Sequence, residues 1–252
     1  APALECRGEV DFDDVFFTYA GGGREALHHV SFHAAPGETI GIIGPTGAGK
    51  STLVNLIPRF YDAGSGVVSV DGVDVTQLDP QDLRAAVAVV PQKALLFSGS
   101  ILENLRWGKE DASIDEVEAA ARVACAHDFI TRTEHGYDTA LGQGGVNLSG
   151  GQKQRLALAR ALIRQPRVLI LDDCTSALDA RTEADVLAGL RQMPDVTVLL
   201  ISQRIAAVRQ ADRVLCLENG EVQGFGTHEQ LMQDCPTYQA IYASQIGGGS
   251  DG

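Results

Sequence analysis

The chain reads Gly44-Pro45-Thr46-Gly47-Ala48-Gly49-Lys50-Ser51-Thr52 between a short apolar run, 39–43, and a segment that is helical up to about Pro58. This is the Gly-x-x-x-x-Gly-Lys-Ser pattern in the strand-to-helix context that a phosphate-binding loop requires. The glycines let backbone N–H groups point inward around the β- and γ-phosphates of a nucleotide, Lys50 adds positive charge, and the Ser51 hydroxyl ligates Mg²⁺. A chance glycine-rich turn is the alternative, but it would not explain strand, Lys-Ser pair and helix together. The motif therefore predicts an α/β fold that binds a nucleotide.

The composition limits the class of protein. The 252 residues are 44% hydrophobic and 21% charged, as in a soluble globular protein of one large or two small domains. The net charge of −13 argues against nucleic acid as a partner, because neutralising phosphates needs clustered Lys and Arg. No apolar run approaches the ~18 residues of a membrane helix. The five cysteines show neither an even number nor metal-ligand spacing, so we expect reduced thiols.

Short apolar runs recur along the chain in a pattern typical of an α/β protein. Residues 9–19 partly alternate polar and apolar, as in a half-buried strand, and 67–75 predict a hairpin. Between about 93 and 156 the strand signal is absent and Glu116–Ala126 is rich in alanine, which predicts a helical insertion. Continuous apolar runs that suit strands buried on both faces of a parallel sheet are 87–90, 168–171 and 196–201.

A second motif follows the phosphate-binding loop by about a hundred residues. It reads Leu148-Ser149-Gly150-Gly151-Gln152 and stands just before a helical segment. The two motifs in this order resemble the nucleotide-binding domain of ABC transporters, in which the Leu-Ser-Gly-Gly-Gln signature of one subunit caps the ATP held by the other. The resemblance covers nearly the whole chain. It implies a dimer with two composite sites, each binding ATP and Mg²⁺, and a second nucleotide-binding domain as partner.

The resemblance also implies a fold class and domain boundaries. The expected fold is α/β: a P-loop NTPase (RecA-like) core with a mostly parallel sheet, an N-terminal antiparallel β subdomain and an inserted α-helical subdomain. The core with its antiparallel subdomain would take residues 1–92 and 157–246, and the helical subdomain 93–156, ending in the signature motif. Residues 247–252 would form a flexible tail, and the chain, which begins with Ala1, is expected to be a piece of a longer protein.

Other family motifs match single positions of this chain. Tyr19 stands where the family places an aromatic ring that stacks on adenine, and Gln92 where the Q-loop glutamine contacts the metal. Ser176-Ala177-Leu178-Asp179 matches the D-loop, which crosses the dimer interface. Asp172 ends the apolar strand 168–171, where a carboxylate reaches the Mg²⁺ shell.

The resemblance thus implies residues for the partner's site, for Mg²⁺ and for the nucleotide. In the partner's site, the Ser149 hydroxyl and the Gly151 N–H would meet the γ-phosphate at a helix N-terminus. The expected Mg²⁺ residues are Ser51, Gln92 and Asp172. The expected nucleotide-binding residues are Tyr19, Gly44, Pro45, Thr46, Gly47, Ala48, Gly49, Lys50, Ser51, Thr52, Ser149, Gly150, Gly151, Gln152 and Asp179.

Two positions depart from the family pattern at the catalytic centre. The family places a Glu after the Asp that ends this strand, to polarise the attacking water, and this chain has Asp173 there. Asp is shorter by about 1.5 Å, and misplacing a catalytic group by roughly that much can cost on the order of a hundredfold in rate. Gln203 stands where the family carries a histidine that contacts the γ-phosphate, and an amide cannot titrate. Gln92, Asp173 and Gln203 therefore make up the expected catalytic set of a slow site.

These two losses beside an intact signature resemble one half of a heterodimeric exporter with a degenerate site. The chain's own site is expected to bind ATP and hydrolyse it poorly, while residues 148–152 complete the partner's site, which turns over. A homodimer with active sites is the alternative. The sequence identifies neither the partner subunit nor the residual hydrolysis rate.

The segment Phe97–Leu105 looks like the one that follows the Q-loop in exporter-type domains, which are usually fused behind six membrane helices. It implies the motor domain of a half-transporter at the cytoplasmic face of the cell (inner) membrane, with a transmembrane domain fused N-terminally. Exporters often carry Gly-Glu-Arg-Gly where this chain has 142–145, so contacts to that domain are expected to differ. A soluble ABC ATPase acting on ribosomes or DNA is a second interpretation, and a regulatory nucleotide sensor a third. The cargo is not encoded in this part of a transporter.

Overall fold

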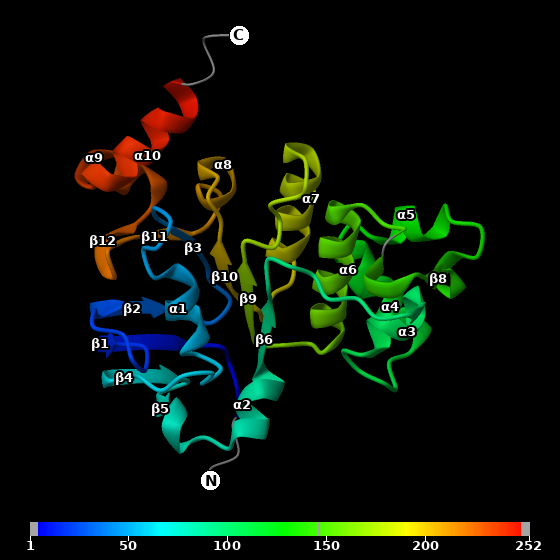
Figure 1. Cartoon of the computed structure of the whole chain (residues 1–252), viewed down its shortest axis with the longest axis horizontal. Coiled ribbons are helices and arrows are strands. Elements are labelled where there is room, and N and C mark those ends of the chain that lie inside the picture. Colours follow the sequence, from blue (N-terminus) through cyan, green and yellow to red (C-terminus); the bar gives the residue numbers. More distant parts are fainter. Residues whose placement is uncertain (1–4, 146, 248–252) are drawn as a thin grey trace. The chain divides into compact units, whose positions relative to one another are not determined.

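The computed structural model describes residues 5–145 and 147–247, which form two compact units (Figure 1). The first unit takes the described residues of 1–87, 167–170 and 195–252, and the second those of 88–166 and 171–194. The boundary expected at 156/157 falls inside one continuous helix, α6 (Gly150–Ile163), which lies wholly in the second unit. The helix continues because no Gly or Pro follows Gly151 until Pro166.

An antiparallel sheet makes up the N-terminal part of the first unit. Strand β1 (Val10–Phe17) pairs with β2 (Leu27–Ala34) on one side and β4 (Ser65–Val70) on the other, and β5 (Val73–Asp74) pairs with β4. Buried and more exposed side chains alternate along part of β1, as its sequence predicts. The predicted hairpin is β4–β5, and its turn residues Asp71 and Gly72 both have positive φ, 50° and 76°, as a type I′ turn requires.

A mostly parallel sheet carries the other half of the first unit. Strand β3 (Thr39–Ile43) pairs parallel with β10 (Thr197–Ile201) and with β11 (Arg213–Glu218), and β12 (Glu221–Gly226) pairs antiparallel with β11. Strand β9 (Val168–Asp172) follows β10 in the sheet order. The side chains of β9 and β10 are buried almost throughout, which confirms the expectation that 168–171 and 196–201 are strands covered on both faces, and those of β3 are buried in the same way.

The helices of the first unit are short. They are α1 (Lys50–Asn55), η1 (Val75–Gln77), α2 (Pro80–Ala86), α8 (Ile205–Val208), α9 (His228–Asp234) and α10 (Pro236–Ile246). The two C-terminal helices pack on the edge of the sheet around the fully buried Tyr238, with Cys216 and Cys235 in the same apolar cluster. The expected P-loop α/β fold with an antiparallel β subdomain is confirmed.

The second unit is largely helical (Figure 1). Besides β6 (Val87–Val90) and α6, its elements are α3 (Ile101–Arg106), α4 (Ile114–Val123), α5 (His127–Thr131), η2 (Gly136–Asp138), η3 (Gln143–Gly145) and α7 (Ala180–Arg191). One expectation for this region is wrong, because a small antiparallel pair, β7 (Gly99–Ser100) and β8 (Ala140–Leu141), lies within it. A strand of two residues is too short to show the alternation of polar and apolar residues by which a strand is predicted from sequence.

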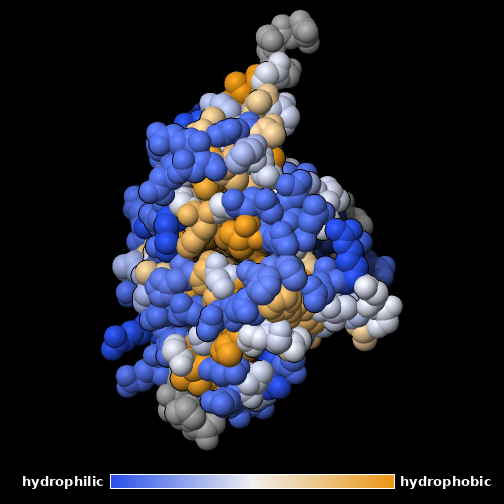
Figure 2. All heavy atoms as spheres, turned by 90° about the vertical axis from the view of Figure 1, so that its left-hand side faces the viewer, coloured by the Kyte–Doolittle hydropathy of each residue, from blue (hydrophilic) through white to orange (hydrophobic). Residues whose placement is uncertain are grey.

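Figure 2 shows one face on which hydrophilic residues predominate and hydrophobic residues form separate patches. Within residues 5–145 and 147–247, the structure contains no helix with the length and apolar character needed to cross a bilayer.

Candidate functional site

The phosphate-binding loop, residues 44–49, runs from the end of β3 directly into α1. Gly49 has a φ of 103°, and a Cβ at this position would lie 2.8 Å from the carbonyl oxygen of Ala26. A Cβ at Gly44 would overlap the backbone carbonyl of Leu217. Both positions therefore require glycine if the loop is to follow this path.

The ammonium group of Lys50 lies against the loop that precedes it. Its Nζ donates hydrogen bonds to the carbonyl oxygens of Gly44, at 2.6 Å, and Pro45, at 3.0 Å. The backbone N–H of Gly220, in the turn between β11 and β12, donates to the carbonyl of Ala48 at 2.8 Å. A positive charge and a fixed loop at a helix start are what a phosphate group requires, so these residues fit a nucleotide.

A hollow of about 450 Å³ opens beside this loop within the first unit. Its volume lies in the range of small-molecule sites. The lining residues are Tyr19, Arg24, Glu25, Ala26, Gly47, Ala48, Gly49, Lys50, Ser51, Thr52, Asn219 and Gly220.

Five of these lining residues were not predicted, among them Asn219 and Gly220. The Asn-Gly dipeptide signals a hairpin turn in the sequence. Its place beside the phosphate-binding loop depends on β11 pairing with β3, a tertiary contact.

Tyr19 is held at the edge of the hollow by a hydrogen bond and two rings. Its hydroxyl and Thr52 Oγ1 lie 2.6 Å apart, and its ring meets Phe17 and Tyr61 edge-on, with centroids at 4.8 Å and 5.3 Å. The side chain is still 41% exposed. A fixed aromatic ring with a free face is suited to stacking on a planar base.

Gln203 follows β10 in the first unit and is exposed. Its backbone carbonyl accepts a 2.6 Å hydrogen bond from Nε2 of Gln245, and Oε1 of Gln245 accepts one from the N–H of Ile205 at 2.9 Å. Gln245, on the C-terminal helix α10, was not predicted as part of this region, because nothing in its local sequence marks it.

The two adjacent carboxylates lie in the second unit, where β9 ends. Asp172 is its last residue and half-buried, and Asp173 follows with a φ of 52°. Asp is among the few residues besides glycine that adopt this left-handed conformation readily. The next residue, Cys174, is buried, and burial raises the pKa of its thiol, so it stays protonated and unreactive.

The signature segment opens helix α6. Ser149 is the N-cap: its Oγ accepts a hydrogen bond from the N–H of Gln152 at 3.1 Å, and Oε1 of Gln152 accepts one from the N–H of Ser149 at 3.0 Å. Ser149 and Gly150 are exposed, so the start of this 14-residue helix faces solvent. Two glycines leave the backbone open there, and a Cβ on Gly151 would lie 3.0 Å from the carbonyl oxygen of Ala177.

The D-loop residue Asp179 caps helix α7. Its carboxylate accepts hydrogen bonds from the N–H of Thr182, at 2.8 Å, and from the Thr182 hydroxyl, at 2.9 Å. These bonds to the charged form lower the pKa of the Asp179 carboxyl. In this structure, the side chain of Asp179 therefore caps the N-terminus of α7.

The expected site residues fall into two groups. Tyr19, the phosphate-binding loop and Gln203 belong to the first unit, in which Tyr19 and the loop line one hollow. The second unit brings together the backbone of Gln92, the D-loop and the signature helix through Gln154, a residue that was not predicted. Asp172 and Asp173 also belong to this unit.

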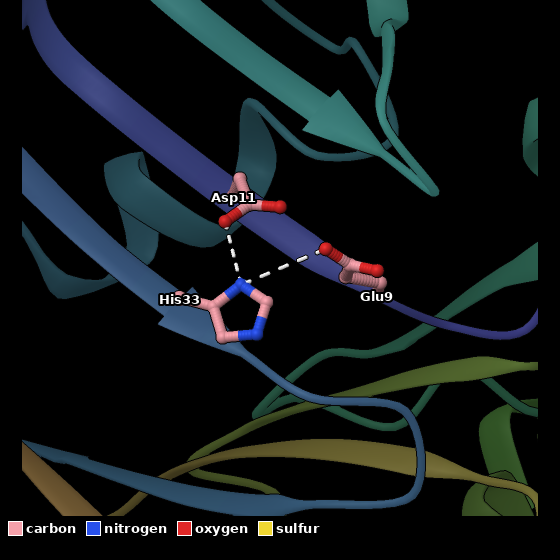
Figure 3. A group of neighbouring side chains, drawn as sticks. All are labelled: Glu9, Asp11 and His33. Carbon is pink, nitrogen blue, oxygen red and sulfur yellow. Dashed lines mark hydrogen bonds and ion pairs between the residues drawn. The ribbon is translucent and has the colours of Figure 1, made fainter.

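A separate group of polar side chains lies on the antiparallel sheet (Figure 3). Nδ1 of His33, on β2, is 2.6 Å from Oδ1 of Asp11, on β1, and 3.8 Å from Oε1 of Glu9. The donor atoms are of kinds that bind divalent cations, but three partly exposed ligands that already pair with one another do not by themselves make a metal site. We assign this group no part in nucleotide binding.

Comparison with known proteins agrees with this geometry. Residues 27–176 match the family model described as ABC transporter. The chain is 50% identical over 240 residues to the uncharacterized ABC transporter ATP-binding protein YfiB of Bacillus subtilis, covering 95% of this chain and 42% of that protein. It is 46% identical to the cyclolysin secretion/processing ATP-binding protein CyaB of Bordetella pertussis, covering 98% and 34%.

A solved structure matches as well. The bacterial Atm1-family ABC exporter with ATP bound superimposes with a TM-score of 0.93 at 42% identity, over 97% of this chain and 43% of that one. This chain thus spans less than half the length of these relatives. The chain belongs to the ABC transporter family as one of its ATP-binding ATPase domains.

Proposed function

We propose that this chain is the motor domain of an exporter-type ABC half-transporter. It would bind Mg·ATP, pair with a second nucleotide-binding domain and power transport through a transmembrane domain. The observation that carries the proposal is the pair of complementary half-sites: a fixed phosphate-binding loop in one unit and an exposed, helix-opening signature segment in the other.

The role of each half-site follows from its chemistry. Lys50 and the N–H groups of the phosphate-binding loop would hold the phosphates, and Tyr19 would support the base. Bound Mg²⁺ would neutralise charge on the β- and γ-phosphates, and Ser51, Gln92 and Asp172 offer the oxygen ligands that this ion prefers. Ser149, at the N-terminus of α6, would complete the site of the partner domain.

The chain's own site is proposed to hydrolyse ATP slowly. Asp173 reaches less far than a glutamate would, and Gln203 offers an amide in place of an imidazole. The intact signature would serve a competent partner, which makes a heterodimer our preferred arrangement and an active homodimer the alternative.

We infer that the transmembrane domain would dock on exposed apolar side chains of the second unit. Leu95, Phe97 and Trp107 are 61%, 43% and 67% exposed, and the rings of Phe97 and Trp107 stack at a centroid distance of 4.5 Å. Exposed apolar side chains of this size, two of them stacked on each other, are typical of an interaction surface. Docking there would place the chain at the cytoplasmic face of the membrane.

The test is multiple-turnover Mg·ATP hydrolysis by the purified chain, its Lys50→Ala variant and its Asp173→Glu/Gln203→His double variant. We expect a parent that binds ATP but turns over slowly, a double variant that turns over well above it, and a Lys50→Ala variant without binding. Turnover in the parent that is lost in Lys50→Ala would instead favour the active homodimer. Nucleotide trapped unhydrolysed by both forms that bind it, the parent and the double variant, would favour a regulatory sensor.

A further inference from the structure

The second unit contains a buried side-chain amide close to the signature motif. Gln154 lies on α6, two residues after the signature motif, and is only 6% exposed. A buried polar side chain is costly unless its hydrogen bonds are made. We therefore expect both ends of the Gln154 amide to be hydrogen-bonded.

Among the described residues, the Gln154 side chain makes hydrogen bonds to the Q-loop and to the D-loop. Nε2 donates to the backbone carbonyl of Gln92 at 3.3 Å and to Oγ of Ser176 at 3.1 Å. Oε1 accepts from the N–H of Ala177 at 2.9 Å. This side chain of the signature helix thus joins the Q-loop, 62 positions earlier in the chain, to the D-loop, 22 and 23 positions later.

We propose that Gln154 is a positioning residue that couples this chain's own site to the site it completes in its partner. The inference rests on the proposed function. In the proposed function, Gln92 belongs to the chain's own site, whereas the signature segment and the D-loop would act across the dimer interface. A shift of the Q-loop would be passed through the amide of Gln154 to the D-loop and to the first turn of α6.

The packing around Gln154 supports a joint movement of these segments. A Cβ on Gly151 would lie 3.0 Å from the carbonyl oxygen of Ala177, so the first turn of α6 and the D-loop are in close contact. Hydrogen-bonded networks in a buried environment hold their members in fixed geometry. The D-loop therefore cannot move away from α6 without breaking the bond between Gln154 and Ala177.

A purely structural role makes a different prediction. If Gln154 only fills space, Gln154→Met should behave like the parent, because methionine has similar volume and adapts to its surroundings. If Gln154 positions the two loops, Met should fail, because it offers no donor to Gln92 or Ser176 and no acceptor to Ala177.

The experiment compares the whole chain with Gln154→Met, Ser176→Ala and the control Gln192→Ala, an exposed glutamine of the same unit. Two quantities are measured: the affinity of the monomer for a fluorescent ATP analogue, which reports the phosphate-binding loop, and Mg·ATP-driven dimerisation by sedimentation, which reports the signature segment and D-loop. Slow hydrolysis keeps the ATP-bound dimer observable.

We expect Gln154→Met to bind nucleotide like the parent and to dimerise at least about fivefold more weakly, the lower end of known coupling strengths. Ser176→Ala should shift dimerisation in the same direction by less, and Gln192→Ala not at all. Unchanged dimerisation of Gln154→Met would overturn the inference, as would an equal loss of nucleotide affinity and dimerisation. A parent that binds Mg·ATP without dimerising would exclude the active homodimer and overturn the inference for two copies of this chain, whereas the proposed heterodimer would stand, and the parent's own curve identifies that case.

Discussion

The side chain of Gln245, near the C-terminal end of α10, holds the backbone of Gln203 in place. Its Nε2 donates to the Gln203 carbonyl at 2.6 Å, and its Oε1 accepts from the N–H of Ile205 at 2.9 Å. The C-terminal helix therefore fixes the loop in which the family carries its γ-phosphate histidine.

Gln245→Ala should loosen this loop without damaging the phosphate-binding loop. The loss of two hydrogen bonds at an exposed residue should cost about 1 kcal/mol of unfolding free energy. Urea unfolding measures this cost, and titration with a fluorescent ATP analogue should show unchanged affinity. Gln223→Ala, at an exposed glutamine on β12, is the matched control and should leave both values as in the parent. Equal stability of the two variants would contradict the role of Gln245.

Tyr19 should act through its ring more than through its hydroxyl. Tyr19→Phe loses the contact with Thr52 but keeps the ring between Phe17 and Tyr61. We expect it to weaken ATP binding by only a few-fold, because one neutral hydrogen bond is worth about 1 kcal/mol. Tyr19→Ala removes the stacking platform and should weaken binding by roughly tenfold or more. Isothermal titration with ATP measures both, and a larger loss in Phe than in Ala would exclude the stacking role.

The sequence predicts the parts of the site that are contiguous in the chain. The phosphate-binding loop, with its glycines, Lys50 and the preceding strand, follows from one motif and lies at the hollow where a phosphate would bind. Gln154, Gln245 and the Asn219-Gly220 turn were not predicted. Each of them contributes through a partner far away in the chain, as Gln245 does with Gln203, and no local pattern encodes such a pairing.

The domain division shows the same limit. The family resemblance placed a boundary at 156/157, beside the signature motif, but α6 continues through that point as one helix. A compact unit is defined by contacts between elements, for example α6 with α4 and α4 with α7. These contacts group α7 with the helical region although it lies beyond strand β9 in sequence.

The N-cap of α7 should make the D-loop region sensitive to acid. Because the folded-state pKa of Asp179 is lowered by its bonds to Thr182, its contribution to stability is present above the unfolded-state pKa of about 3.9 and is lost as the pH falls through the lower folded value. Asp179→Asn keeps a capping oxygen without a titrating group, so its stability should vary less with pH below about 4. Thermal melts between neutral and acidic pH measure this difference, and parallel curves for the two proteins would contradict it.

Asp173→Glu should extend the carboxylate toward the position that the family's glutamate takes, and it should lower the stability of the fold. Asp173 has a φ of 52°, a conformation that Asp tolerates better than Glu, so the substitution should lower stability by up to about 1 kcal/mol. In the Gln203→His background the longer carboxylate should raise turnover by tenfold or more, since errors of ~1 Å in placing a catalytic group carry penalties of that size or larger. Asp173→Asn is the matched control, because it accepts the same φ but lacks the carboxylate. It should be without residual hydrolysis. Residual hydrolysis that survives Asp173→Asn would show that the carboxylate of Asp173 takes no part in the reaction, and the slow rate would then have to be attributed to Gln203 alone.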